Sequence, residues 1–198
     1  MSKLLLFIAI FFSIPSLVSA QGLDYQILKD LNQYQSPSDN KFQKFISDAD
    51  APIVLGVPVA MVGISFLNKD KDLRRKGLEA CAAQVLTVGG TYLLKEIVKR
   101  PRPFVTYPDL KNVTTEGSWS FPSGHTSSAF AFATSMSLSY PKWYVIVPSY
   151  TFASAVGFSR MYLNVHYPSD VLVGAILGSA SAWVTWKISK KLQAKKKV

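Results

Sequence analysis

"FSRMYLNVHYPSD", residues Phe158 to Asp170, joins two long apolar stretches of the chain. Arg160, His166 and Asp170 fall within eleven consecutive positions, where one apolar stretch ends and the next begins. Buried charges are costly unless they are paired or bind a ligand of opposite charge. The segment therefore predicts a polar site where two helices of a bundle meet.

The composition favours an integral membrane protein with a single domain. Hydrophobic residues make up 48% of the 198 residues and charged residues 17%, and the apolar residues are clustered. They form five runs, at residues 51–67, 78–98, 126–140, 143–158 and 171–188. A bilayer core about 30 Å thick requires about 20 helical residues, so the runs predict an all-α bundle of about five transmembrane helices. A soluble helical bundle is the alternative.

The N-terminus has the features of an export signal. Lys3 precedes an apolar stretch at 4–17, and the small residues 18–20 suit cleavage after Ala20. An uncleaved first membrane helix is the alternative, which would raise the number of crossings to six. Residues 21–50 are polar, with hydrophobic side chains spaced three or four positions apart and a break at 36–38. This pattern predicts one or two amphipathic helices on the exported face of the membrane.

The formal charge of +10 is concentrated in two blocks, residues 68–77 and 187–198, each of which follows an apolar run. Neither block is interleaved with aromatic residues, and no nucleic-acid-binding motif is present, so we expect no nucleic-acid partner. Basic residues typically flank the cytoplasmic ends of membrane helices. Five crossings then place the loops at 99–122 and 159–170 together on the exported side.

These two loops and the positions next to them hold residues suited to binding an anion. Lys95, Arg102 and Arg160 are able to surround a dianion, and the guanidinium fork suits phosphate oxygens. Ser123 and Gly124 open an apolar run, and a helix start there directs backbone N–H groups toward a negative ligand. The sequence therefore predicts a phosphate-binding site.

His125 and His166 are the only histidines of the chain, and they lie in these loops or directly beside them. One imidazole is suited to attack phosphorus, and the other to protonate the leaving oxygen and then activate water. Asp170 follows His166 by four residues, and Pro168 can open a helix between them, so the carboxylate can fix the tautomer of the ring and raise its pKa. We expect no second carboxylate in the site, and no metal or other cofactor.

Three motifs carry a resemblance to a known family. They are Lys-x6-Arg-Pro at 95–103, Pro-Ser-Gly-His at 122–125, and Ser-Arg-x5-His-x3-Asp at 159–170. In this order they resemble the type 2 phosphatidic acid phosphatase (PAP2) superfamily, which includes membrane lipid phosphatases, soluble bacterial acid phosphatases and vanadium haloperoxidases. The resemblance implies a PAP2-type phosphatase domain over residues 51–198.

The resemblance also implies a role for each residue. His166 would be the nucleophile, His125 the general acid, and Asp170 the partner of His166. The phosphate-binding residues would be Lys95, Arg102, Ser123, Gly124 and Arg160. Lys99 and Arg100 are interpreted instead as anchors at the membrane surface.

The resulting hypothesis is a multi-pass membrane phosphatase of a bacterial inner membrane, with its site facing the periplasm and residues 104–120 as a lid. The substrate would be a lipid phosphate or diphosphate. Undecaprenyl diphosphate and lipid A are preferred to phosphatidylglycerol phosphate and phosphatidic acid, because an exported site suits an envelope lipid. The alternatives are a secreted soluble acid phosphatase, a vanadium haloperoxidase, and a non-enzymatic membrane scaffold that binds anionic headgroups. The sequence leaves the oligomeric state open.

Overall fold

The computed structural model describes residues 17–114 and 116–195, and every regular element in these ranges is a helix. The helices are α2 (Leu17–Gln33), α3 (Pro37–Asp48), α4 (Asp50–Leu67), α5 (Lys71–Val98), α6 (Pro103–Thr106), α7 (Gly124–Ser139), α8 (Trp143–Tyr162) and α9 (Pro168–Lys195). The predicted all-α class is confirmed, and the five apolar runs correspond to α4, α5, α7, α8 and α9, although α5 begins seven residues before its run and α9 ends seven residues after its run. The predicted export signal over residues 1–20 lies almost entirely outside the described residues.

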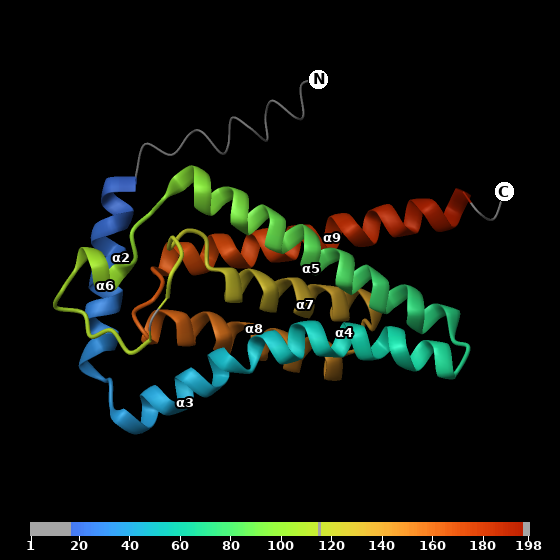
Figure 1. Cartoon of the computed structure of the whole chain (residues 1–198), viewed down its shortest axis with the longest axis horizontal. Coiled ribbons are helices and arrows are strands. Elements are labelled where there is room, and N and C mark those ends of the chain that lie inside the picture. The colour runs from blue at the N-terminus through green and yellow to red at the C-terminus, as the bar shows by residue number, and fades with distance from the viewer. Residues whose placement is uncertain (1–16, 115, 196–198) are drawn as a thin grey trace, which may run out of the picture.

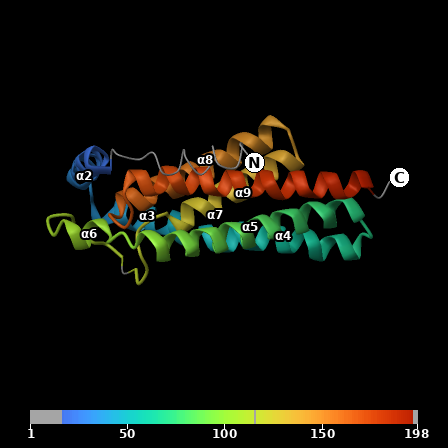
Figure 2. The same cartoon turned by 90° about the horizontal axis from the view of Figure 1, so that it is seen from above.

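The five long helices run side by side along the long axis of the molecule (Figure 1). α7 lies inside the bundle and contacts α9, α8, α5 and α4. α2 and α6 lie at one end, beside the end of α5 and the start of α9, and α3 leads from there toward α4 (Figure 1). Figure 2 shows the turn between α4 and α5 at the opposite end, together with the C-terminal part of α9. Loops far apart in the sequence therefore meet at the end that holds α2.

Local sequence explains where the helices stop at this end. Lys99 ends α5 in the left-handed conformation, with φ 48°, and Pro103 opens α6. Ser123 precedes α7 with an extended backbone. Pro168 opens α9, where its fixed φ and missing N–H fit a first helical turn. These breaks create the loops that carry the three sequence motifs.

The centre of the bundle is rich in small residues, and its outer face is apolar. The buried residues of α7 are mostly serine, threonine and alanine. Large hydrophobic side chains are exposed on the surrounding helices, among them Leu55, Val59 and Phe66 on α4, Val85, Leu93 and Ile97 on α5, and Leu172, Ile176 and Trp183 on α9. Small residues inside and large apolar residues outside are typical of helices packed within a lipid bilayer.

Two stretches are long and apolar enough by themselves to cross a membrane, Pro37–Leu67 and Pro168–Lys195. The first contains α3 and α4, and the second is α9. α7 has only 16 residues, below the lower bound of about 17 for a spanning helix. The predicted crossings by α5, α7 and α8 therefore stay a prediction.

Two glycines allow α9 to pack directly on α7. A Cβ added at Gly178 would lie 2.0 Å from the carbonyl oxygen of Ser127 and 2.8 Å from the amide nitrogen of Ala131. A Cβ added at Gly174 would lie 2.8 Å from the carbonyl oxygen of Ser123. Both approaches are closer than van der Waals contact, so they require a residue without a Cβ. The loop before α7 and the start of α9 are adjacent to this contact, which therefore holds the two together.

We expect Gly178→Ala to lower the thermal unfolding midpoint of the protein in detergent micelles. Overpacking costs about 1–3 kcal/mol, and a clash with backbone atoms is relieved only if α9 moves away from α7. Gly89→Ala in α5 is the matched control, because a Cβ added there meets no atom within 4 Å. The control should keep or slightly raise the midpoint. An unchanged midpoint for Gly178→Ala would show that the two helices are not packed this closely.

Candidate active site

The residues predicted to form the site gather at the end of the bundle that holds α2. They come from the last turn of α5 (Lys95), the loop before α6 (Arg102), the start of α7 (Ser123, Gly124, His125), the last turn of α8 (Arg160), the loop before α9 (His166) and the first turn of α9 (Asp170). Helix ends from most of the bundle therefore contribute to one polar cluster in an otherwise apolar protein.

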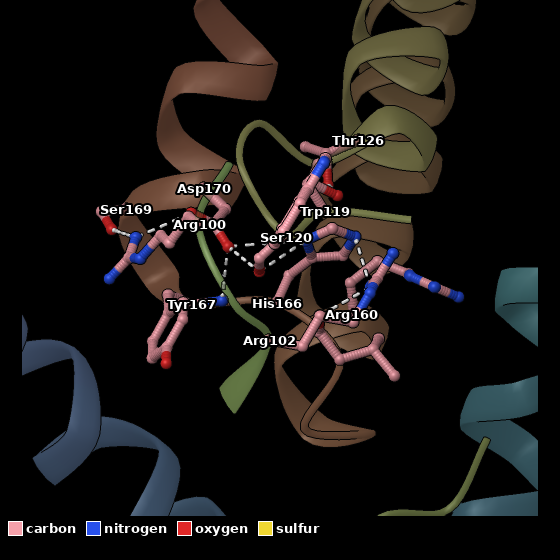
Figure 3. A network of polar contacts seen from close by, with 12 residues as sticks. Arg100, Arg102, Trp119, Ser120, Thr126, Arg160, His166, Tyr167, Ser169 and Asp170 are labelled. Atoms are coloured by element: carbon pink, nitrogen blue, oxygen red, sulfur yellow. Dashed lines mark hydrogen bonds and ion pairs between the residues drawn. The ribbon is translucent and has the colours of Figure 1, made fainter. Parts of the chain in front are cut away.

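His166 has a different kind of partner on each ring nitrogen (Figure 3). Its Nδ1 lies 3.5 Å from Oδ2 of Asp170 and 3.5 Å from Oγ of Ser120. Its Nε2 lies 3.3 Å from Nη1 of Arg102. A proton on Nδ1, directed at the carboxylate, leaves the lone pair of Nε2 facing the cations. The ring is therefore oriented for attack by Nε2 on a bound anion.

The carboxylate of Asp170 is fully buried, and both of its oxygens have partners. Oδ2 accepts hydrogen bonds from Oγ of Ser120 at 2.5 Å and from the backbone N–H of Tyr167 at 3.0 Å. Oδ1 accepts one from Nη1 of Arg100 at 2.7 Å. These partners compensate the burial of the charge and fix the carboxylate beside His166.

Arg100 belongs to this network, so its interpretation as a membrane anchor is wrong. Its Nη2 pairs with Oδ2 of Asp24 in α2 at 2.8 Å, and its Cζ lies 3.7 Å from the centroid of the Tyr167 ring. Asp24 also accepts a hydrogen bond from the backbone N–H of Ser169 at 3.0 Å. Figure 3 shows the Arg100 side chain reaching between Ser169 and Asp170. The predicted amphipathic segment thus supplies, through α2, a carboxylate to the network.

Arg102 and Arg160 are almost completely buried, with 4% and 3% of their surface exposed. Nη1 of Arg102 donates to the carbonyl oxygen of Val165 at 2.8 Å, and Nη1 of Arg160 donates to Oγ of Ser47. Nη2 of Arg160 donates to Oε1 of Glu116, and Nη2 of Arg102 lies 3.6 Å from Oε2 of the same carboxylate. Within the described residues, the buried Nε of Arg160 has no hydrogen-bond partner. Two buried guanidinium groups that share one carboxylate define a strong anion-binding position.

The segment just before the Pro-Ser-Gly-His motif covers the cations. Nζ of Lys95 donates to the carbonyl oxygen of Trp119 and, at 3.5 Å, to that of Ser120. Nε of Arg102 donates to the carbonyl oxygen of Ser118 at 2.8 Å. The end of the predicted lid therefore lies directly against two of the predicted phosphate-binding residues.

One backbone N–H at the start of α7, that of Ser123, is bonded to another part of the protein. The backbone N–H of Ser123 donates to the carbonyl oxygen of Asp170 at 3.1 Å, and its Oγ accepts a hydrogen bond from Oγ1 of Thr126 at 2.9 Å. Gly124 and His125 follow as the first two residues of the helix, and both are half-buried. The amide of Ser123 thus joins α7 to α9, while the phosphate contact predicted for this residue stays a prediction.

The surroundings of His166 determine its protonation in a way that differs from the prediction. Burial lowers the pKa of His166 to about 3; Asp170 acts in the opposite direction, and Arg102 lowers the pKa further. Asp170 thus acts in the predicted direction, but the net shift of the pKa is downward because the ring loses its hydration, which costs more than the carboxylate returns. Burial also opposes ionisation of Glu116, but Arg160 and Arg102 outweigh it and hold the pKa of this carboxyl below its usual range. His166 is therefore neutral and Glu116 charged at physiological pH.

Three side chains of the site were not predicted: Asp24, Glu116 and Ser120. The expectation that the site holds no second carboxylate is therefore wrong. Only Ser120 carried a local signal, because it lies two residues before the Pro-Ser-Gly-His motif. In residues 17–114 and 116–195, no three histidine, cysteine, aspartate or glutamate side chains form a group that could hold a metal ion. These side chains suit binding of a multiply charged oxyanion beside an imidazole whose Nε2 lone pair faces the cations.

Comparison with known proteins agrees with this geometry. The family model described as the PAP2 superfamily matches residues 76–194, more than half of the chain. A lipid A 1-phosphatase of Porphyromonas gingivalis is 30% identical over 169 residues, which are 84% of this chain and 35% of that relative. An undecaprenyl-diphosphatase of Sulfolobus acidocaldarius is 28% identical over 166 residues, which are 83% of this chain and 76% of the relative. The chain thus spans about a third of the first relative and three quarters of the second.

A solved structure extends the similarity to the whole fold. The crystal structure of a transmembrane PAP2-type phosphatidylglycerolphosphate phosphatase from Bacillus subtilis matches with a TM-score of 0.76 and 27% sequence identity, over 96% of this chain and 95% of that one. The match includes α2 and α3, since it covers nearly all residues of both chains. The chain belongs to the PAP2 superfamily, and its similarity lies with the membrane lipid phosphatases of that family.

Proposed function

We propose that this protein is a membrane phosphatase that hydrolyses a lipid phosphate or diphosphate through a phosphohistidine at His166, without a metal ion. The observation that carries the proposal is the orientation of His166, with Nδ1 toward Asp170 and Nε2 toward Arg102. A scaffold that only binds headgroups would need the cations but not an imidazole with a fixed tautomer.

The reaction proceeds in two displacements. Nε2 of His166 attacks phosphorus, the bond to the lipid oxygen breaks, and that oxygen takes a proton from His125. A water molecule then attacks the phosphohistidine, gives a proton to His125, and releases inorganic phosphate from His166. Lys95, Arg102 and Arg160 stabilise the phosphoryl oxygens as charge redistributes, together with the groups of Ser123 and Gly124 at the start of α7.

Asp170 stabilises the positive charge that forms on His166 during the attack, and Arg100 holds Asp170 in place. Both oxygens of Asp170 are already paired, so the carboxylate does not need to reorient as the reaction proceeds. Arg100 is therefore a positioning residue, because its ion pairs are with Asp170 and Asp24.

The proposed topology has five crossings, by α4, α5, α7, α8 and α9, with the site on the exported side of a bacterial inner membrane. The basic residues 69–76 and the end of α9 lie at the opposite end of the bundle from the site (Figure 2), which is consistent with the positive-inside rule. Residues 1–20 would be the export signal or a first membrane helix, 21–50 an exported-side segment, and 51–198 the phosphatase domain. The lipid headgroup would then reach the site while its chains remain in the bilayer.

An envelope lipid is the preferred substrate, either undecaprenyl diphosphate or a lipid A phosphate. The names of the relatives from Porphyromonas gingivalis and Sulfolobus acidocaldarius support these two classes. The apolar outer face of α4, α5 and α9 disfavours a secreted soluble acid phosphatase.

The test is release of inorganic phosphate by the purified protein from a panel of lipid phosphates in mixed micelles, with EDTA present throughout. We expect release from at least one lipid, a loss of at least about 10³-fold for His166→Ala, and a loss of about 10²–10⁴-fold for His125→Ala. Orthovanadate should inhibit, because it mimics five-coordinate phosphorus. Lys99→Gln is the control, since it removes an exposed cation near the site. Full activity of His166→Ala, or activity that requires added magnesium, would contradict the mechanism.

Substitution of Arg100 tests its positioning role. Arg100→Ala should lower kcat by about 10–100-fold, as expected for loss of a group that orients a catalytic side chain, with little change in KM. Arg100→Lys should recover part of kcat, because it keeps a charge beside Asp170. A change confined to KM, or no change at all, would show that Arg100 does not act through Asp170.

The protonation of His166 can be followed directly because the chain has only two histidines. In the variant His125→Gln, the remaining imidazole NMR signal should not titrate between pH 8 and 5, since burial lowers the pKa of His166 to about 3. A depressed pKa favours the neutral ring at every pH above it, so the nucleophile stays available across this range. A titration midpoint near 6.5 would mean that the ring is hydrated and not enclosed as described.

A further inference from the structure

Glu116 lies where a phosphate group is expected to bind. Its Oε1 accepts a hydrogen bond from Nη2 of Arg160, and its Oε2 lies 3.6 Å from Nη2 of Arg102. The two guanidinium groups are almost completely buried, whereas 24% of the Glu116 side chain is exposed. The carboxylate therefore reaches the arginines from the open side of the site.

The contacts of this carboxylate are those of a bound oxyanion. Two oxygens of one negative group each face a guanidinium, and Nη1 of Arg102 is 3.3 Å from Nε2 of His166. A phosphorus atom attacked by Nε2 must have its oxygens close to these same guanidinium groups. The Glu116 carboxylate and a substrate phosphate thus require the same donors, and they exclude each other.

We propose that Glu116 is a specificity-determining residue, which occupies the phosphate position until a doubly charged phosphate group displaces it. The proposal rests on the function proposed above, because it assigns Arg102 and Arg160 to the substrate phosphate. Displacement releases Glu116 to solvent, and its exposure shows that it lies at the solvent side of the cluster. Gly117 follows it, and a Cβ added there would meet no atom within 4 Å, so an outward movement meets little packing resistance.

The donors around Arg160 favour phosphate over the carboxylate. The Nε of Arg160 is buried and lacks a hydrogen-bond partner within the described residues, although Glu116 is bound to the same guanidinium. A carboxylate offers two oxygens, whereas a phosphate monoester offers three and an additional negative charge. A monoester dianion can therefore satisfy donors that Glu116 leaves unpaired.

The same competition discriminates against the bulk lipids of the membrane. A phosphodiester headgroup such as that of phosphatidylglycerol carries one negative charge, as a carboxylate does, and has only two free phosphoryl oxygens. Glu116 is held beside the arginines by its own chain and so competes at a high effective concentration. A singly charged diester gains too little to displace it, and a site built this way rejects diesters while accepting monoesters and terminal diphosphates.

The test compares Glu116→Gln with wild type in detergent micelles, using the lipid that gives the highest rate of phosphate release. Removal of the competing charge should lower KM, and also the inhibition constant of inorganic phosphate at pH 8, by at least about tenfold. Short-chain phosphatidylglycerol should inhibit Glu116→Gln competitively while leaving wild type almost unaffected. Glu96→Gln is the matched control, because it removes the same charge from an exposed position in the last turn of α5, at the end of the bundle that holds the site. Its KM and inhibition constants should equal those of wild type.

An unchanged or higher KM and phosphate inhibition constant in Glu116→Gln would overturn the proposal, as would equal inhibition of both proteins by phosphatidylglycerol. Thermal unfolding with and without inorganic phosphate gives a readout that does not require catalysis. A larger phosphate-induced rise of the unfolding midpoint in Glu116→Gln than in wild type supports the proposal, and an equal rise contradicts it. If Glu116→Gln binds phosphate no better than wild type while His166→Ala is inactive, only the role proposed for Glu116 is refuted. If His166→Ala is active, the proposed reaction itself is refuted.

Discussion

The structure depends on one buried carboxylate, that of Asp170, which is fully enclosed at the start of α9. An unpaired charge in such a place would cost several kcal/mol, on the order of the whole stability of a domain. Its partners Arg100, Ser120 and the N–H of Tyr167 come from three different segments. The requirement to satisfy one charge therefore ties the end of α5, the loop before α7 and the α8–α9 loop into a single unit, and it places His166 within that unit.

The close packing of α7 on α9 makes this unit possible. Gly174 and Gly178 let the two helices approach until backbone atoms are in contact, and the amide of Ser123 then reaches the carbonyl oxygen of Asp170. Small residues provide this proximity without an aqueous hydrophobic driving force, as expected for helices inside a bilayer. The small serine, alanine and glycine residues between α7 and α9 thus fix the relative positions of the site residues on these two helices.

The site also holds a cluster of positive charges. Lys95, Arg102 and Arg160 lie close together in a mostly apolar protein, so their charges repel one another. Carbonyl oxygens of the segment before α7 and the carboxylate of Glu116 compensate these charges. The cluster is therefore neither exposed nor empty of negative charge. An anion that binds there must gain more than these internal partners already supply, so the cations alone do not set its affinity.

The sequence by itself determined the helices and the central residues of the site. Apolar runs predicted α4, α5, α7, α8 and α9 because the hydrophobicity and length of a run are local properties of the sequence. The chemistry and spacing of the motifs pointed to His166, Asp170 and Arg102, which the structure brings together. Only the tertiary structure revealed the contacts of Arg100 and Glu116. The partner of a buried charge is whichever group packing brings beside it, and Asp24 lies 76 positions from Arg100. Depression of the His166 pKa has the same origin, since hydration is lost only when distant segments close around the ring.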